Sequence, residues 1–518
     1  SLKEYPYPYL VEGADDPVQA MIQIPQNYNE TTLKTALLLS ADLGHRLPFE
    51  NVEPDLKLYD ANNLENENLI YIGRKTNLPK EYREKLTLEE LDKLNNEVLI
   101  KEIEHPRNKD KRIMMILGES EEKMLMAVKS LFEDDLQLQN DSSVVWINDK
   151  TFVDENKDDE DEYLTFEELG YAPITLSGER FNSVKYDYRM PGNWQIKDGA
   201  QLYLRLRYAD VINYDTSSVT VKMNEVPVFS KKLVKEGHRL DDFFVDIPDE
   251  IKNADTLSIE VSFTLDVPRD CASGSFDQNT WAFVSNDSYL YLPHEDRDKF
   301  DLENYPYPLI KDGELNNLKV LHDRGKFLNE LSHAFGYIGH RLRNISNIEI
   351  IEEVPEKLDA GQYIYIGGAS KDGFVSVFND VIKLGYDENY ETYRREHSNW
   401  VNVDNDSLGI LQLTRGENYN IVSLTGLSEK PLKNASKYLS DFGFVGRLGG
   451  DVQVLYASGQ NQIVHRTVEQ NVIQDVKDRG DINTEALNRL SGAEIRQFLI
   501  FLGLLIFGSA IVVVLKKR

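Results

Sequence analysis

Cysteine is almost absent from this chain. Cys271 is the single one among 518 residues, so no intrachain disulfide can form. Zinc or redox sites of the C-x-x-C type are excluded for the same reason. A chain without disulfides draws its stability from its core, and 41% hydrophobic residues are enough to build one. Cys271 itself is more typical of a small buried residue than of a nucleophile.

Positive charge is scarce as well. The 58 basic residues face 88 acidic ones, which gives a net charge of −30. A surface this acidic repels a phosphate backbone, so we expect no nucleic-acid partner. The motifs H-E-x-x-H and G-x-S-x-G are missing, and no catalytic pair of carboxylates stands out among so many acids.

A long run without charge closes the chain. As a helix, Phe498–Leu515 would span about 27 Å, close to the ~30 Å hydrocarbon core of a bilayer. The basic residues Lys516–Arg518 follow and mark the cytoplasmic side. We therefore expect a single transmembrane helix, with all preceding residues extracellular or periplasmic; the alternative is a buried core helix. Gly503, Gly508 and Ser509 would let a partner helix approach closely.

Two further expectations concern the segment just before this apolar run and the start of the chain. Residues 480–497 place Leu487, Leu490 and Ile495 on one helical face, which is typical of a helix in the membrane interface. A solvated stalk helix fits the same pattern equally well. The chain begins with Ser1 and shows no signal pattern, so we expect that an export signal precedes it.

Four short motifs occur twice in the same order, about 300 residues apart, which indicates two copies of one domain. The pairs are Tyr5–Pro8 with Tyr305–Pro308, Gly44–Leu47 with Gly339–Leu342, Leu69–Gly73 with Tyr363–Gly367, and Gly118–Glu121 with Gly426–Glu429.

Each copy alternates apolar strands with helices. In the first, Asn29 is placed to cap a helix that runs to about His45. Apolar strands are predicted at Gln19–Ile24 and Arg112–Leu117. This alternation favours an open, mostly parallel sheet, so we expect α/β domains at residues 1–150 and 301–465.

The middle of the chain differs from both copies. Residues 151–172 form an acidic linker, where carboxylates suit a calcium ion but the spacing of an EF-hand is missing. Between residues 173 and 300, short segments such as Gln201–Tyr208 alternate polar with apolar residues. This pattern predicts an all-β sandwich of the jelly-roll type.

No cofactor and no metal are expected in the α/β copies. A flavodoxin holds phosphate in a loop after its first strand, and neither Pro25–Tyr28 nor Asp323–Gly325 has that composition. Gly367–Lys371 resembles half of a Walker loop without its spacing. His45 and His340 end equivalent helices. A recurring histidine can be a ligand or an acid–base group, but offsetting the helix dipole is the favoured interpretation.

Five aromatic residues of the predicted sandwich are candidates for carbohydrate binding, because ring faces can stack on the apolar C–H surfaces of sugars. The alternative is that they are ordinary core and rim residues. The candidates are Trp194, Tyr203, Tyr208, Tyr214 and Trp281.

Two α/β copies, an intervening β-domain and a C-terminal anchor together resemble the membrane-anchored B subunit family of bacterial cellulose synthase. The likeness covers essentially the full chain; its specific parts are the paired Tyr-Pro-Tyr-Pro motifs and the stretch Asp270–Pro293. It implies two flavodoxin-like α/β domains without flavin, flanking a carbohydrate-binding-like jelly-roll sandwich. That family normally has one more carbohydrate-binding-like domain ahead of the first α/β domain, which is absent here.

The resemblance also implies a function. Such a protein is a non-catalytic subunit: its anchor packs against the multi-pass catalytic cellulose synthase subunit, and its ectodomain receives the nascent β-glucan. Two rival hypotheses come from other classes. A membrane-anchored polysaccharide-modifying enzyme would need a polar cleft with paired carboxylates or a metal. A cell-surface sugar-binding receptor would keep its function with an unrelated anchor.

Overall fold

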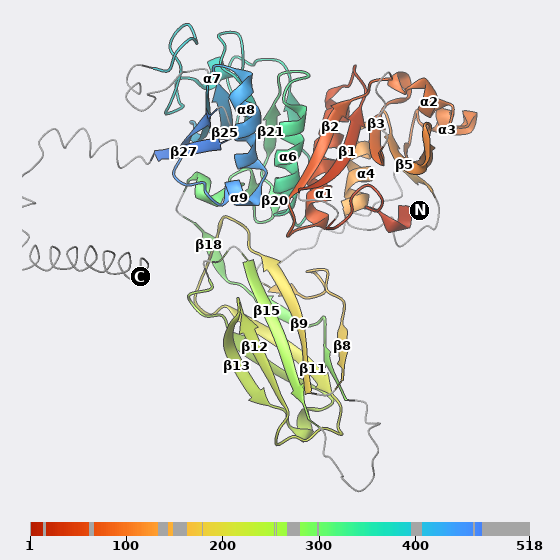
Figure 1. The fold of residues 1–518 in the computed structure, drawn as a ribbon, viewed down its shortest axis with the longest axis vertical. Coiled ribbons are helices and arrows are strands. Elements are labelled where there is room, and N and C mark those ends of the chain that lie inside the picture. Colours follow the sequence, from red (N-terminus) through yellow and green to blue (C-terminus); the bar gives the residue numbers. More distant parts are fainter. Residues whose placement is uncertain are drawn as a thin grey trace, which may run out of the picture. The chain divides into compact units, whose positions relative to one another are not determined.

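The structure is a computed structural model (Figure 1), in which residues up to Thr467 form one compact unit. Four predicted features lie wholly or largely outside the described residues: the acidic linker up to residue 162, the segment 480–497, the run 498–515 with Gly503, Gly508 and Ser509, and Cys271. No helix within the described part of the chain is long and apolar enough to cross a membrane. The structure describes residues 2–13, 17–61, 67–132, 143–148, 163–178, 180–252, 254, 256–266, 280–297, 300–394, 407–458 and 462–468.

The first α/β domain is a six-stranded sheet with buried side chains on both faces. Its elements are β1 (Val18–Ile24), α1 (Glu30–Arg46), β2 (Val52–Leu58), β3 (Leu69–Gly73), α2 (Lys80–Arg83), α3 (Leu88–Lys93), β4 (Val98–His105), β5 (Asn108–Leu117), α4 (Glu121–Phe132) and β6 (Val144–Ile147). The strand order is β2-β1-β3-β5-β4-β6. The pairs among β2, β1, β3 and β5 are parallel, and the pairs that β4 makes with β5 and β6 are antiparallel.

The second α/β domain repeats this arrangement. Its elements are β19 (Ile310–Lys311), β20 (Glu314–Leu315), β21 (Leu318–Leu321), α6 (Leu328–Gly339), β22 (Glu349–Ile351), β23 (Gly361–Gly368), α7 (Val375–Phe378), β24 (Leu408–Arg415), β25 (Tyr419–Gly426), α8 (Glu429–Ala435), α9 (Phe442–Val445), β26 (Val452–Ser458) and β27 (Gln462–Val468). The order β22-β21-β23-β25-β24-β26 matches that of the first sheet, with the same parallel and antiparallel pairs, and β27 extends it. A shared strand order is what a duplication produces.

Three of the five strand pairs in the first sheet are parallel, in agreement with the predicted mostly parallel sheet, but the antiparallel pairs were not predicted. β4 joins β5 through Pro106 and Arg107 alone, and a connection this short links only antiparallel strands. β24 and β25 are joined in the same way through residues 416–418. The predicted helix cap is confirmed, because Asn29 Oδ1 accepts a hydrogen bond of 3.1 Å from Thr32 N.

In the sequence, a sandwich of two antiparallel sheets lies between the two α/β domains. Its elements are β7 (Tyr163–Thr165), β8 (Ile174–Ser177), β9 (Arg180–Arg189), β10 (Trp194–Ile196), β11 (Gln201–Tyr208), β12 (Ser218–Met223), β13 (Val226–Lys232), β14 (Asp241–Asp246), β15 (Thr256–Leu265), β16 (Trp281–Val284), β17 (Tyr289–Tyr291) and β18 (His294–Asp296). One sheet has the order β7-β17-β11-β16-β8, with β14 on the other edge of β11; the second has the order β13-β12-β15-β9. Alternate residues of these strands point into a shared core.

The two α/β domains meet through the equivalent helices α1 and α6 (Figure 1). A Cβ atom added to Gly44 would lie 1.9 Å from the carbonyl oxygen of Gly336. A Cβ added to Gly339 would lie 1.8 Å from the carbonyl oxygen of Ala41. Gly44 and Gly339 are the first residues of the repeated Gly-His-Arg-Leu motif. The same glycine of each copy therefore lies against the helix backbone of the other copy. No larger residue fits at either position without moving a helix.

Polar contacts give the direction of the two helices. Ser40 Oγ lies 2.8 Å from Ser332 Oγ within the contact. Tyr28 lies just ahead of α1 and His322 ahead of α6, and Tyr28 Oη lies 2.9 Å from His322 Nε2. Because the residues before both helices meet, α1 and α6 run parallel. Burial, together with the charge of Arg324, lowers the pKa of His322 to about 4, so its ring is neutral at neutral pH.

The glycine contact predicts a strong effect of one methyl group. Gly44→Ala should destabilise the protein by at least about 2 kcal/mol, because the added carbon meets backbone that cannot rotate away. The higher helix propensity of alanine offsets about 1 kcal/mol of a larger cost. The midpoint of urea unfolding measures the change. Gly449→Ala is the matched control, since a Cβ there meets nothing within 4 Å; equal midpoints for the two variants would contradict the contact.

The neutral histidine predicts a dependence of stability on pH. The unfolded chain takes up a proton near pH 6.5, whereas folded His322 does so only near pH 4. The stability contributed by the neutral ring is therefore complete above pH 6.5, and about 3 kcal/mol of it is lost as the pH falls to 4. His322→Gln should make urea midpoints fall less steeply over this range, with His238→Gln as the control. Parallel pH profiles for wild type and His322→Gln would refute the assignment.

Candidate carbohydrate-binding face

The outer face of one sandwich sheet is set by the alternation along β11. Leu202, Leu204 and Leu206 are fully buried in the core. Tyr203 and Arg205 stand between them and therefore point outward. Neighbouring strands place their own outward residues beside these two, so the register of the sheet decides what gathers on this face.

Aromatic rings line up across the strands of this face. Tyr203 is paired with Phe244 on β14 and with Tyr289 on β17, with ring centres 5.1 and 4.8 Å away. Tyr291, two residues along β17, is paired with Tyr163 on β7 at 4.7 Å. We call these five residues the aromatic row. Cross-strand pairs of this kind stabilise a sheet by roughly 0.2–1 kcal/mol each.

The rings of the aromatic row stand beside one another. The planes of Tyr203 and Tyr289 make an angle of 26°, and those of Tyr163 and Tyr291 an angle of 32°. Ring edges and hydroxyl groups therefore face solvent along the middle of the row. The solvent-exposed surface of the row is concentrated at its two ends, where Phe244 is 52% and Tyr163 47% exposed. Such a row offers apolar contact together with hydrogen-bonding groups.

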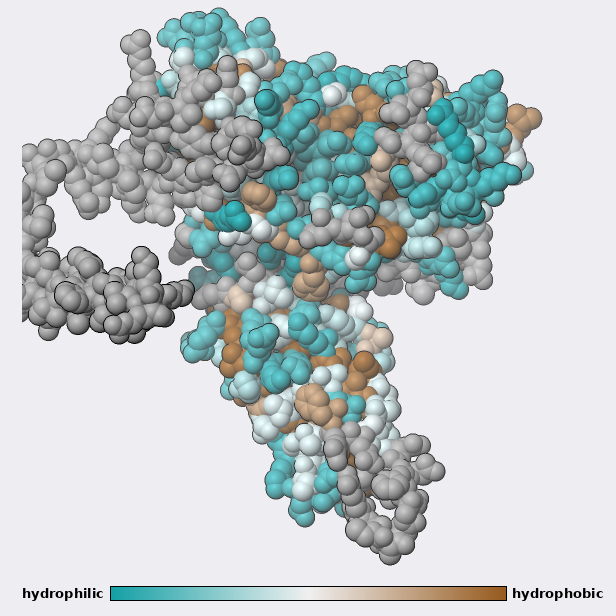
Figure 2. Space-filling model, in the orientation of Figure 1, coloured by the Kyte–Doolittle hydropathy of each residue, from teal (hydrophilic) through white to brown (hydrophobic). Residues whose placement is uncertain are grey.

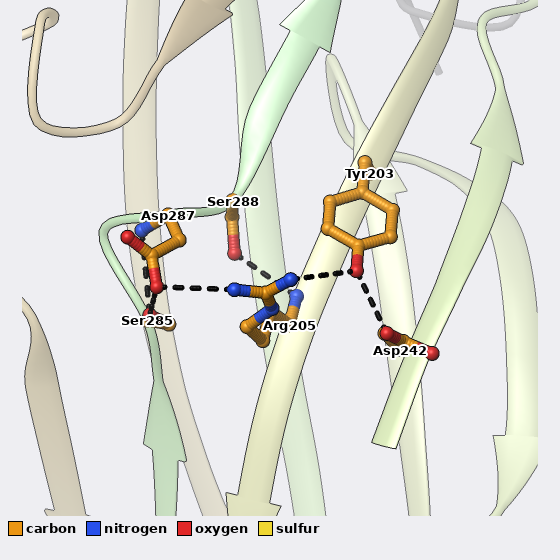
Figure 3. Close-up of polar contacts among 6 residues, drawn as sticks. All are labelled: Tyr203, Arg205, Asp242, Ser285, Asp287 and Ser288. Atoms are coloured by element: carbon orange, nitrogen blue, oxygen red, sulfur yellow. Dashed lines mark hydrogen bonds and ion pairs between the residues drawn. The ribbon is translucent and has the colours of Figure 1, made fainter. Parts of the chain in front are cut away.

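A polar cluster lies beside the aromatic row (Figure 3). Arg205 Nη2 donates to Tyr203 Oη at 3.3 Å, and Arg205 Nη1 donates to Asp287 Oδ2 at 3.2 Å. Tyr203 Oη in turn donates to Asp242 at 2.7 Å. Burial and the hydrogen bond to Asp242 raise the pKa of Tyr203, so its hydroxyl keeps its proton. Ser288 Oγ accepts from Arg205 N at 3.0 Å and holds the strand in place.

These contacts contribute little to folding. The side chains of Arg205 and Asp287 are 36% and 61% exposed, and exposed ion pairs contribute about 0–1 kcal/mol. What the cluster supplies is a fixed set of donors and acceptors next to aromatic rings. On β16, Trp281 and Phe283 continue the same outward face, with the guanidinium of Arg207 at 5.7 Å from the centre of the Phe283 ring.

The outer face of the other sandwich sheet is mostly polar, although Phe181 on β9 is 63% exposed there. Thr220 Oγ1 lies 3.1 Å from Ser230 Oγ, and Lys222 Nζ donates to Glu260 at 3.1 Å. Ser262 Oγ also donates to Glu260, at 3.0 Å. Over the α/β domains, hydrophobic residues appear as scattered patches among hydrophilic ones (Figure 2). Aromatic residues are thus more numerous on the first outer face, which makes that face the candidate binding surface.

Two of the five sugar-binding candidates are not on any surface. Trp194 is fully buried: its ring stacks on His294 at 3.7 Å, and its Nε1 donates to Asp312 Oδ1 at 2.7 Å. Tyr208 is fully buried too, and its hydroxyl donates to Val234 O at 2.8 Å. The prediction is corrected for both, because a ring enclosed by the core cannot stack on a sugar.

The other three candidates are half-buried. Tyr203 and Trp281 lie on the outward face, and Tyr214 lies in the loop after β11, with its hydroxyl donating to Asp210 O at 3.3 Å. The sequence analysis missed Phe244, Tyr163, Phe283, Tyr289 and Tyr291. The alternation of tyrosine with leucine in residues 289–292 was the available signal for the last two.

Tyrosines lie near the carboxyl ends of β3 and β23, where open α/β sheets commonly bind ligands. In the first α/β domain Tyr71, on β3, packs against Tyr82 at 4.9 Å. In the second, Tyr365 is its equivalent on β23, and its hydroxyl donates to Asp323 at 2.9 Å. No group of three or more His, Cys, Asp or Glu side chains suited to a metal occurs among the residues that the structure describes.

Two family models match the chain. Residues 1–145 match "Cellulose synthase BcsB, first FD domain", and residues 159–296 match "Cellulose synthase BcsB, first CBM domain". The second description places a module so named after the first α/β domain. No curated protein matches the chain.

Solved structures resemble the chain only remotely. An acetyl xylan esterase (Est2A) from the rumen bacterium Butyrivibrio proteoclasticus is 8% identical over 29% of this chain and 37% of its own, with a TM-score of 0.12. Dimeric latent PorU from Porphyromonas gingivalis is 8% identical over 35% of this chain and 25% of its own, also with a TM-score of 0.12. This chain thus spans about a third and a quarter of their lengths, and neither match carries an argument.

Proposed function

The chain belongs to the BcsB family of cellulose synthase accessory subunits, and on that premise we propose that its sandwich guides a nascent β-glucan with the aromatic row and the polar cluster. The observation that carries this proposal is the one-sided gathering of aromatic rings beside Arg205, Asp242 and Asp287. A β-glucan chain presents apolar C–H faces and a rim of hydroxyl groups. Aromatic edges and faces suit the first, and charged donors and acceptors suit the second.

The open shape of this face also supports an extended ligand. The aromatic row crosses the four strands β14, β11, β17 and β7, so one long chain can lie along it and move on. A subunit that releases its polymer needs many weak contacts rather than one tight site. In this proposal the protein itself is non-catalytic, and the bond-forming chemistry belongs to a multi-pass catalytic subunit.

We propose the remaining features on the family resemblance. The segment 498–515 would span the membrane once, with the C-terminus in the cytoplasm and the ectodomain extracellular or periplasmic, and residues 480–497 would lie at the interface. The α/β domains would be flavodoxin-like relatives that bind no flavin: the order β2-β1-β3 is that of flavodoxin, and the loop after the first strand of each copy lacks a phosphate-binding composition. A polysaccharide-modifying enzyme and a sugar-binding receptor are the alternatives.

The proposal predicts that the aromatic row binds soluble β-glucan. Replacing Tyr203 and Tyr289 together by alanine should weaken binding of cello-oligosaccharides by about tenfold, since each aromatic contact contributes about 0.5–1.5 kcal/mol. Isothermal titration calorimetry on the full chain in detergent measures the affinity.

The matched control for this pair lies on the polar face of the other sheet. Thr220→Ala with Lys222→Ala removes two outward side chains of the same sandwich and should leave affinity unchanged. If both double variants bind equally well, the aromatic row is not the glucan site. Loss of polymer synthesis with unchanged binding would instead indicate a role in contacting the catalytic subunit.

The proposed anchor contact predicts a second effect. Replacing Gly503, Gly508 and Ser509 together by leucine should preserve membrane insertion, because leucine is at least as apolar. It should lower polymer synthesis by co-expressed subunits severalfold, because larger side chains push a partner helix away. Phe501→Leu with Ile506→Leu is the control. Unchanged synthesis at an equal membrane level of the triple variant would leave the segment as a passive tether.

A further inference from the structure

A cavity lies at the second occurrence of the Gly-His-Arg-Leu motif. It has a volume of about 240 Å³ and opens where the ends of β9 and β15 meet α6 and α9. Its principal lining side chains are Arg189 and Thr256 from the sandwich, and Glu303, Tyr337, Arg341 and Phe442 from the second α/β domain. The proposed glucan function makes no use of this site.

Two guanidinium groups from different domains reach the cavity. Arg341, which follows α6, donates from Nη1 to the carbonyl oxygen of Met190 at 3.2 Å. The guanidinium carbon of Arg189 lies 4.6 Å from the ring centre of Phe442 and 5.1 Å from that of Phe49. Phe49 belongs to the first α/β domain and Phe442 to the second, so Arg189 stands where three domains meet. These contacts hold both positive charges in place.

Two arginines and one glutamate line this cavity, in a chain that as a whole carries −30. Glu303 is the one acidic residue among the side chains that line it. His340, next to Arg341 in the motif, is buried, and burial together with the charge of Arg189 holds its pKa well below the usual range. The end of α6 offsets part of this charge, because a helix C-terminus is equivalent to only about half a negative charge.

We propose that the cavity binds a small organic oxyanion, with its charged group between Arg189 and Arg341. Planar guanidinium groups match phosphate and carboxylate oxygens in pairs, which favours an oxyanion over a neutral sugar. The rings of Tyr337 and Phe442 form an apolar wall, and the volume suits a body of about one sugar ring. The ligand class is therefore a phosphate monoester or carboxylate carried on a sugar-sized group. This site goes beyond the proposed glucan function and does not depend on it.

Calorimetry on the full chain in detergent tests the proposal with three probes: glucose 6-phosphate, glucuronate and glucose. Saturable binding is expected for a charged probe and not for glucose, and the two charged probes distinguish phosphate from carboxylate. Arg341→Gln should weaken that binding about tenfold or more, as expected for loss of a charge-assisted hydrogen bond. Glu303→Gln should strengthen it, because a like charge is removed from the ligand's surroundings.

Arg447→Gln is the matched control. Arg447 is exposed, follows α9, and lies over Phe444 at 5.2 Å without lining the cavity. Arg447→Gln removes one positive charge near the cavity, as Arg341→Gln does, and should leave the affinity for the charged probe within about twofold of wild type. Equal binding of glucose, no saturable binding of either charged probe, or equal losses in Arg341→Gln and Arg447→Gln would overturn the proposal. If Arg341→Gln does not fold, the increase expected for Glu303→Gln still decides the outcome.

Discussion

The close contact of α1 with α6 is the constraint on which the rest of the structure depends. Gly44 and Gly339 leave room for backbone to lie on backbone, and the two helices run parallel because the residues before them also meet. Parallel helices bring their negative ends together. Basic residues of both motif copies gather at that end, where Arg46 pairs with Asp42 at 3.2 Å and His340 is buried. The helix-dipole interpretation therefore fails for His340, because burial and the charge of Arg189 hold its pKa well below the usual range and leave the ring without a charge.

The same contact makes one core from two domains. A Cβ added to Gly336 would lie 2.7 Å from the carbonyl oxygen of Val52, so α6 also lies against β2, an edge strand of the first sheet. Covering an edge strand removes a site at which another chain could pair. A single cluster of buried residues extends from β1 through α1 and α6 to β23. Each copy therefore lacks part of its core when it stands alone, which is why the duplication acts as one folding unit rather than as two repeated modules.

Local sequence patterns predicted many of the helices and strands. The direction of strand pairing and the packing of helices depend on residues far apart in the chain. Repeated motifs, the Asn29 cap and the apolar strands were readable because each depends on neighbours along the chain. β4 was missed because its half-buried charged residues Lys101 and Glu102 interrupt the apolar run, and its antiparallel pairing follows from a hairpin that was not recognised. A single motif does not indicate which helices pack together. A glycine that allows close helix packing can be recognised only when the backbone against which it packs is known.

The aromatic residues of the sandwich make the same point about function. Tyr203 faces solvent and Trp194 faces the core, although both occur in short alternating strands. The side that a residue takes depends on the parity of its strand, which one bulge or turn reverses. Trp194 has a structural role, because it joins the sandwich to the second α/β domain. Its Nε1 donates a hydrogen bond to Asp312, and the guanidinium of Arg343 lies 4.6 Å from the centre of its ring. The residues of the aromatic row are not among these contacts: they stabilise their own sheet through cross-strand pairs, and the row stays exposed at Phe244 and Tyr163.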